Sequence, residues 1–163
     1  MEVKKATIND IDAIQRLAAQ IWPVAYREIL SEAQLNYMLN KFYSEEALKD
    51  QILTKGHQFY ILVNEGKLEL GFAAISKENE EIFKLQKLYV LPSEQGKKLG
   101  KMLLDEVISY IKKKGGKALI LNVNRYNKAQ FFYQKQSFKI IEEVDIAIGN
   151  NYFMNDFVML RNL

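Results

Sequence analysis

The stretch at residues 88–107, LYVLPSEQGKKLGKMLLDEV, constrains the fold more than any other part of the chain. An apolar β-type run ends at Pro92, a polar turn containing Gly96 and Gly100 follows, and an amphipathic helix begins directly afterwards. The first amides of a helix have no intrahelical partner, and the aligned peptide dipoles place partial positive charge there. This junction therefore predicts an anion-binding site. Its composition also fits a solvated basic turn before an ordinary helix.

Hydrophobic periodicity predicts the remaining elements. Helical spacing and capping residues indicate three helices: residues 7–22, which Pro23 ends or kinks, a segment after Ser31 and a segment after Ser44. The runs QFYILVN, LELGFAAIS and EIFKLQKLYVL predict three antiparallel strands joined by short turns. A helix near residues 99–114, a strand, a short helix and two final strands complete the order. We expect a single α/β domain over residues 1–163, built on a mixed sheet.

The amino-acid composition limits the kinds of catalytic and metal-binding groups available to the chain. The chain has no Cys and only one His, His57, which excludes thiolate nucleophiles and disfavours a metal site. Its net charge of +3, from 23 Lys and Arg against 20 Asp and Glu, is too small to indicate nucleic-acid binding. No run of about twenty apolar residues predicts a membrane span, and the first residues lack a signal-peptide pattern. We therefore expect a cytoplasmic protein that binds neither nucleic acid nor membranes.

Two familiar phosphate-binding loops do not match the junction. A P-loop needs four residues between its glycines and then Lys-Ser or Lys-Thr, whereas three residues separate Gly96 from Gly100 and Lys101 precedes Met102. The dinucleotide fingerprint Gly-x-Gly-x-x-Gly is absent as well. The sequence therefore disfavours ATP or GTP binding through this loop and gives no support to a Rossmann fold.

The junction instead resembles the pyrophosphate loop of the GCN5-related N-acetyltransferases, the GNAT family. That family's pattern is Arg or Gln, two residues, Gly, one residue, then Gly or Ala, after an apolar strand. Gln95 and Gly100 fit this pattern, whereas Lys98 stands where the family usually has Gly. Because such a loop binds through main-chain amides, a side chain at Lys98 is tolerable if its φ is negative and the side chain points outward.

A second segment, NVNRYNKAQFFYQKQSF, is similar to a later GNAT motif. Asn127, Ala129, Tyr133 and Phe138 fall in the family's order, and Ser137 replaces the customary Gly. Ala129 and Tyr133 lie one helical turn apart and share a face. The alternative is that the aromatic residues of this segment only pack a core. The C-terminal run VDIAIGNNYFMNDFVM is similar to the closing hairpin of a subgroup that includes bacterial polyamine acetyltransferases.

The resemblance implies a GNAT-like fold and acetyl-CoA as co-substrate, with no metal. Its sheet is mixed and mostly antiparallel, splayed at the cofactor site, with helices on both faces. The coenzyme would lie between the strand ending at Val90 and the strand ending near Val123. The implied cofactor-binding residues are Leu88, Tyr89, Val90, Gln95, Gly96, Lys97, Lys98, Leu99, Gly100, Lys101 and Asn127.

The implied reaction is attack of an acceptor amine on the thioester. A primary amine with a pKa of about 10.4 is almost wholly protonated at neutral pH, so a proton must leave it. Tyr133 is the expected catalytic acid for the departing thiolate. The general base is not identified, because the strand before the loop lacks the family's usual Glu. Glu81 could act through a water molecule, Glu28 could contribute, or the pocket could lower the pKa of the amine without a base.

The acceptor pocket is expected to contain Trp22, Tyr26, Glu28 and Tyr152, although core packing accounts for the same residues equally well. The expected function is acetyl transfer to a primary amine of a small molecule, a polyamine or a peptide, by a monomer or homodimer. The alternative is an acyl-CoA-binding module without turnover. The missing strand carboxylate and the departures at Lys98 and Ser137 favour that alternative.

Overall fold

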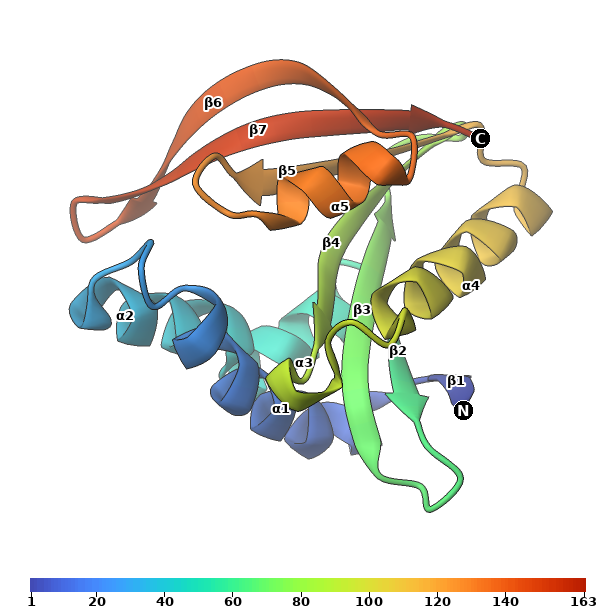
Figure 1. Ribbon diagram of the computed structural model, residues 1–163, viewed down its shortest axis with the longest axis horizontal. Helices are drawn as coiled ribbons and strands as arrows, with labels where there is room; N and C mark the ends of the chain where they lie inside the picture. Colours follow the sequence, from blue (N-terminus) through green and yellow to red (C-terminus); the bar gives the residue numbers. More distant parts are fainter.

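The computed structural model describes residues 1–163 as one seven-stranded sheet with helices on both sides (Figure 1). The elements in chain order are β1 (Glu2–Lys5), a 3₁₀ turn η1 (Ile8–Asp10), α1 (Ile11–Ala25), α2 (Glu32–Tyr43), α3 (Glu45–Leu53), β2 (Gln58–Val63), β3 (Glu69–Lys77), β4 (Ile82–Val90), a 3₁₀ turn η2 (Pro92–Glu94), α4 (Leu99–Lys113), β5 (Ala118–Asn124), α5 (Ala129–Lys135), β6 (Lys139–Gly149) and β7 (Tyr152–Asn162). No helix combines the length and the apolar character needed to cross a bilayer.

The sheet has the order β1-β2-β3-β4-β5-β7-β6, and β4 with β5 is its one parallel pair. A parallel pair needs a crossover connection, and α4 supplies it between β4 and β5. The predicted mixed and mostly antiparallel sheet is therefore confirmed.

Two apolar clusters occupy the two faces of the sheet. The alternation of side chains along β3 shows the division, since Phe72 and Ala74 pack with α1–α3 while Ala73 and Ile75 pack with α4. Figure 1 shows α1, α2 and α3 on one side of the central strands and α4 and α5 on the other. Helices cover both faces, as the resemblance implied.

The strands β4 and β5 separate part of the way along their length. They are paired only from Ile82 with Ala118 to Leu85 with Leu121. At the same point the β3–β4 register shifts, leaving Gln86 as an extra residue in β4. Such a bulge bends a strand and increases its twist. Past it, β4 follows β3 and β5 follows β7, so the two strands diverge (Figure 1). We call this divergence the fork.

Of the two effects expected at Pro23, an end or a kink, the structure excludes the end, and it adds the short strand β1 to the predicted elements. Helix α1 continues through Pro23 to Ala25, and the amide of Tyr26 bonds to the carbonyl of Trp22 at 3.0 Å, so helical bonding resumes after the proline. A proline removes one donor but does not stop a helix whose packing face continues. The strand β1 was not predicted, because its four residues are too few to display a period.

Candidate active site

A cavity of about 230 Å³ lies in the fork. Its wall combines the diverging parts of β4 and β5 with residues of α1, α2, α5 and the β6–β7 hairpin. The bulge at Gln86 and the end of pairing at Leu85 are what open this space. The residues predicted from sequence that line it are Trp22, Tyr26, Leu88, Tyr89, Asn127 and Tyr133.

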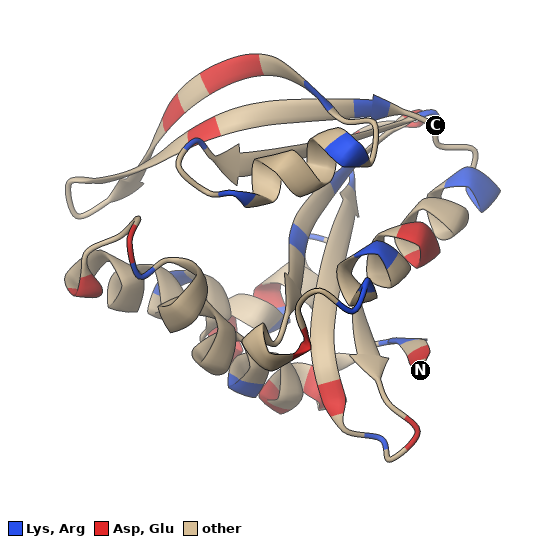
Figure 2. Ribbon diagram, in the orientation of Figure 1, with Lys and Arg blue, Asp and Glu red and all other residues tan.

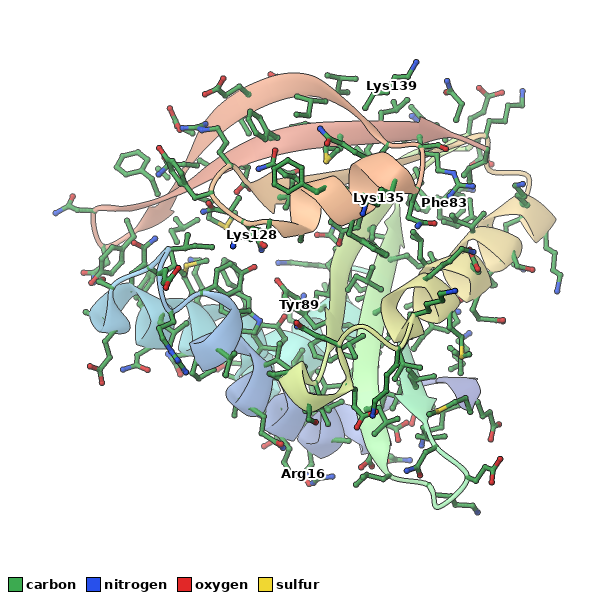
Figure 3. The ribbon with its side chains drawn as sticks, viewed as in Figure 1. Arg16, Phe83, Tyr89, Lys128, Lys135 and Lys139 are labelled. Carbon is green, nitrogen blue, oxygen red and sulfur yellow. The ribbon has the colours of Figure 1, made fainter.

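Aromatic residues of α1 and β4 form one wall of the cavity. The hydroxyls of Tyr26 and Tyr89 lie 2.9 Å apart, and the ring of Trp22 packs 4.6 Å from that of Tyr26 and 5.9 Å from that of Tyr89 (Figure 3 labels Tyr89). Burial raises the pKa of both tyrosines above the usual value. Both hydroxyls therefore stay protonated at neutral pH.

Tyr133 reaches the cavity from α5. Its ring packs 5.2 Å from Phe132 and 5.6 Å from Phe138, and only 8% of the residue is exposed. Burial raises its pKa, so the phenol is neutral at physiological pH. Its hydroxyl donates to no protein acceptor and therefore has its proton available for a group inside the cavity.

The main chain at the start of α4 has a run of unused donors. The amides of residues 96–101 bond to no protein acceptor, and no side chain caps the helix. Gly96 has φ +81° and Lys98 has φ +62°. The condition of a negative φ at Lys98 is therefore not met, because the chain enters the helix through a left-handed residue. That conformation costs a residue with a Cβ about 1–2 kcal/mol.

Gly100 leaves the first turn of α4 without a side chain beside α5. A methyl group added there would lie 3.7 Å from Phe132 Cζ, an ordinary contact, so the fold itself does not demand glycine. A glycine inside a helix costs roughly 0.5–1 kcal/mol relative to alanine. The small residue leaves the amides on the side of the helix that faces α5 accessible.

Lysines surround this junction, as Figure 2 shows at the start of α4 and at both ends of α5. Lys97 and Lys101 form ion pairs with carboxylates of their own segment, whereas Lys98 has no ion-pair partner. Figure 3 places Lys128 and Lys135 at the two ends of α5. The positive charge adds to that of the helix N-terminus and favours an anion between the two helices.

The loop before α5 explains two motif residues. Asn127 Oδ1 accepts the amide of Ala129 at 2.9 Å, which fixes the start of α5 and leaves the side-chain amide group as a donor. Ser137 follows α5 with φ +68°. Its left-handed conformation is the one that glycine adopts freely, which accounts for the family's preference at this position.

Several residues predicted for the site do not line the cavity: the junction residues 95–101, Glu28, Tyr152, Glu81 and Val90. Glu28 is exposed in the turn after α1, and Tyr152 packs its ring 5.3 Å from Tyr37. Glu81 Oε1 lies 2.5 Å from Lys117 Nζ at the start of β4, away from the fork. Val90 lies at the end of β4 and does not line the cavity. The fork therefore receives neither of the carboxylates considered as bases.

The cavity wall also contains three charged residues that were not predicted for the site: Lys84, Lys87 and Asp156. Lys87 Nζ donates to Gln51 Oε1 at 2.8 Å, and burial lowers its pKa to about 7. Asp156 on β7 is 6% exposed, and burial raises its pKa. The sequence feature that could have identified them is a charged residue inside a mostly apolar strand. Lys87 lies in KLQKLYV, and Asp156 lies in YFMNDFVML.

This arrangement, a sheet opened between two parallel strands with unused amides at the following helix, places the chain in the GNAT class of acetyltransferases. The family model described as an acetyltransferase (GNAT) domain matches residues 26–151, more than half of the chain. The chain belongs to this family.

Two similar proteins match nearly the whole chain, and a third matches about half of it. It is 31% identical over 163 residues to a spermidine N(1)-acetyltransferase of Thermoplasma acidophilum, spanning 94% of this chain and 95% of that protein. The crystal structure of the PaiA N-acetyltransferase of T. acidophilum in complex with coenzyme A superposes with a TM-score of 0.85 at 28% identity, covering 99% and 98% of the two chains. A ribosomal protein bS18-alanine N-acetyltransferase of Haemophilus influenzae is 38% identical over 84 residues, 52% of this chain and 53% of that protein.

Proposed function

We infer that the protein transfers the acetyl group of acetyl-CoA to the primary amine of a small molecule, a polyamine or a peptide. The observation that carries this inference is the set of free amides at residues 96–101, which follow the diverging strand β4, together with a neutral tyrosine in the cavity of the fork. A Cβ at Gly100 would lie 3.7 Å from Phe132 Cζ, next to Tyr133 in the sequence, which supports a coenzyme that reaches from the junction to the phenol.

The residues present fit the coenzyme. Its diphosphate would accept hydrogen bonds from the amides of residues 96–101, beside the positive end of α4. Its pantetheine arm would lie along β4 at Leu88 and Val90, where β5 no longer supplies a pairing strand. Asn127 would donate its side-chain amide to the same arm. Acetyl-CoA supplies the thioester, and a structural relative was crystallised with coenzyme A.

Tyr133 would act as the general acid. Its buried hydroxyl keeps its proton at neutral pH and has no protein acceptor, so it is ready to donate to the sulfur of the departing thiolate. Phe132 and Phe138 pack against its ring, and only 8% of the residue is exposed. A neutral donor is suited to this task, since it adds no charge to the ground state.

The wall of the cavity favours an amine acceptor. The rings of Trp22, Tyr26 and Tyr89 line the cavity, and aromatic rings attract cations to their faces. The full-length relative named for spermidine supports a small or polyamine acceptor. The relative named for a ribosomal protein matches only about half of the chain and gives weaker support to a peptide acceptor.

Release of the coenzyme A thiol tests the proposal. The purified protein is incubated with acetyl-CoA and a panel of spermidine, propylamine and an alanine-initiated peptide, and thiol is measured with a chromogenic disulfide. We expect release above the amine-free rate with at least one amine, and a product heavier by one acetyl group in mass spectrometry. Tight binding of acetyl-CoA without release for any amine would instead identify an acyl-CoA-binding module.

A further inference from the structure

Asp156 is the cavity residue that neither coenzyme binding nor Tyr133 explains. It is the only carboxylate that lines the cavity, and it is 6% exposed. Its one side-chain hydrogen bond comes from Asn122 Nδ2 to Oδ2, at 3.4 Å. A buried carboxylate without a cation is costly unless other groups compensate its charge. Its presence therefore indicates that a bound molecule supplies positive charge here.

The nearby cations do not neutralise it. Arg125 Nη2 lies 2.7 Å from Asp145 Oδ1, and its Nε lies 3.2 Å from Glu143 Oε1. Towards Asp156, Arg125 reaches only the main-chain carbonyl, at 3.4 Å. Lys84 lines the same cavity and forms no ion pair with Asp156. Burial outweighs both positive charges and raises the pKa of the Asp156 carboxyl.

The remaining titratable groups that line the cavity are Lys87, whose Nζ donates to Gln51 Oε1 and forms no ion pair with Asp156, and phenols that keep their protons. Tyr26 follows the last residue of α1 and Tyr133 lies on α5, and burial raises the pKa of both. The cavity-lining neighbours on β5 are amides, Asn122 and Asn124. Asp156 is thus the one carboxylate of the cavity wall, and accepting a proton relieves the cost of its own burial.

The sheet places Asp156 and Tyr133 on opposite faces of the fork. Asp156 is opposite Asn124 in the β5–β7 register and shares the face of Met154, which packs with the α1–α3 cluster. Tyr133 belongs to the other cluster, with Val123. A thioester lying in the fork would therefore have the phenol on one side and the carboxylate on the other, which suits departure of sulfur on one side and arrival of the amine on the other.

We propose that Asp156 binds the ammonium group of the acceptor and takes its proton. This proposal rests on the proposed function and deepens it, because it assigns the acceptor to primary alkylamines that are cationic at neutral pH. Neither Glu28 nor Glu81 competes for this role, since the first is exposed outside the cavity and the second pairs with Lys117.

Asp156 and Tyr133 together account for every proton that moves in the reaction. One ammonium proton passes to Asp156, and the freed lone pair forms the C–N bond at the thioester carbonyl. The C–S bond breaks, and the thiolate takes the Tyr133 proton. A second proton from the amine nitrogen restores Tyr133, and Asp156 returns its proton to solvent. The net reaction converts ammonium and thioester into amide, thiol and one proton.

The test compares two acceptors that differ in basicity. Propylamine is almost entirely ammonium at neutral pH, whereas 2,2,2-trifluoroethylamine is largely neutral there. We expect Asp156→Asn to lower kcat/KM for propylamine by about 100-fold or more, the usual contribution of general base catalysis. The loss for trifluoroethylamine should be below about tenfold, because its nitrogen needs no deprotonation before attack.

Controls separate this role from a structural one. Glu142→Gln removes an exposed carboxylate of β6 and should leave both rates unchanged. Asp156→Asn should keep the wild-type affinity for acetyl-CoA in calorimetry, and Asp156→Glu should recover part of the propylamine rate. If Asp156→Asn does not fold, the displaced carboxylate of Asp156→Glu must still lower the propylamine rate more than the trifluoroethylamine rate.

Equal losses for the two amines, or no loss for either, would overturn the assignment while leaving acetyl transfer intact. A wild-type protein that binds acetyl-CoA and acetylates no amine would overturn both the assignment and the proposed function.

Discussion

Leu85 and Leu121 form the last pair at which β4 and β5 lie in register. Their side chains are buried in the core on the α4 side of the sheet, and the next residue of β4, Gln86, is the extra residue of the bulge. The pair therefore marks the boundary between the closed part of the sheet and the cavity. Every group assigned to the reaction lies on the open side of this boundary.

Gly100→Glu should affect stability and binding in opposite directions. A side chain has room at this position, replaces glycine in a helix and places negative charge at a positive helix end. We expect the free energy of unfolding to rise by about 0.5–1.5 kcal/mol. The added carboxylate should repel the diphosphate and weaken acetyl-CoA binding by about 100-fold, or roughly 2.7 kcal/mol.

Met102→Glu is the matched control for this variant. Met102 lies in the first turns of the same helix and is 39% exposed, about 200° around the helix from Gly100. The substitution introduces the same charge on the side away from α5. Chemical denaturation and calorimetry should show a smaller stability change and nearly unchanged acetyl-CoA binding. Equal weakening by the two variants would argue against a contact at Gly100.

Tyr133→Phe should slow the chemical step without disturbing the fold. The phenol bonds to no protein acceptor, so its removal leaves no partner unsatisfied, and we expect kcat to fall by about 10²–10⁴. Acetyl-CoA affinity and the melting temperature should stay near the wild-type values. Tyr126→Phe, at a residue that is 70% exposed, provides the control. An unchanged kcat in Tyr133→Phe would remove this residue from the mechanism.

Lys98→Gly and Ser137→Gly should each stabilise the protein. Both residues occupy the left-handed region, at φ +62° and +68°. Glycine adopts this conformation without the steric cost of a Cβ, so each substitution should raise the free energy of unfolding by about 1 kcal/mol. Lys97→Gly, in the same turn but without a positive φ, should not stabilise. Destabilisation by both glycine variants would show that their side chains hold the turns.

Lys87 should make stability depend on pH in a defined direction. Its pKa is lowered to about 7 by burial, below its value in the unfolded chain, so between pH 7 and 10 the unfolded state binds more protons. The lysine's contribution to the free energy of unfolding therefore rises with pH in this window, by at most about 1.4 kcal/mol per unit.

Denaturation of the wild type and Lys87→Met from pH 7 to 9 isolates this contribution. The difference in free energy of unfolding should shift in favour of the wild type as pH rises. Other groups largely cancel in the difference, and His57, whose pKa is lowered to about 4, is neutral throughout. A pH-independent difference would show that the Lys87 ammonium is not destabilised by burial.

The sequence could predict what depends on local pattern. Capping at Ser31 and Ser44 and apolar periodicity defined the helices, and the loop motif located the junction at α4. The bulge at Gln86 was not predicted, because the register of β4 depends on its pairing with β3 rather than on its own residues. The burial of Asp156 in the cavity was not predicted either, because it depends on strands and helices that are distant in the chain.

The positive φ of Lys98 could have been anticipated only by trusting the family's glycine over the residue present. Lysine is compatible with a helix start, and its identity alone predicts an ordinary turn. The backbone follows the requirement of the junction and accepts the strain. At Lys98 and Ser137, the glycine that the family usually has therefore indicated the left-handed backbone conformation better than the residue present in this chain.

The central claim is that the main-chain amides of residues 96–101 bind the diphosphate of coenzyme A. Amide NMR spectra recorded during titration with coenzyme A test it most directly, because each of these amides gives its own signal. We predict that the largest shifts fall on residues 96–101, including the glycine signals of Gly96 and Gly100, while β1 stays unmoved. Saturable binding of coenzyme A that leaves these amides unshifted would contradict the account.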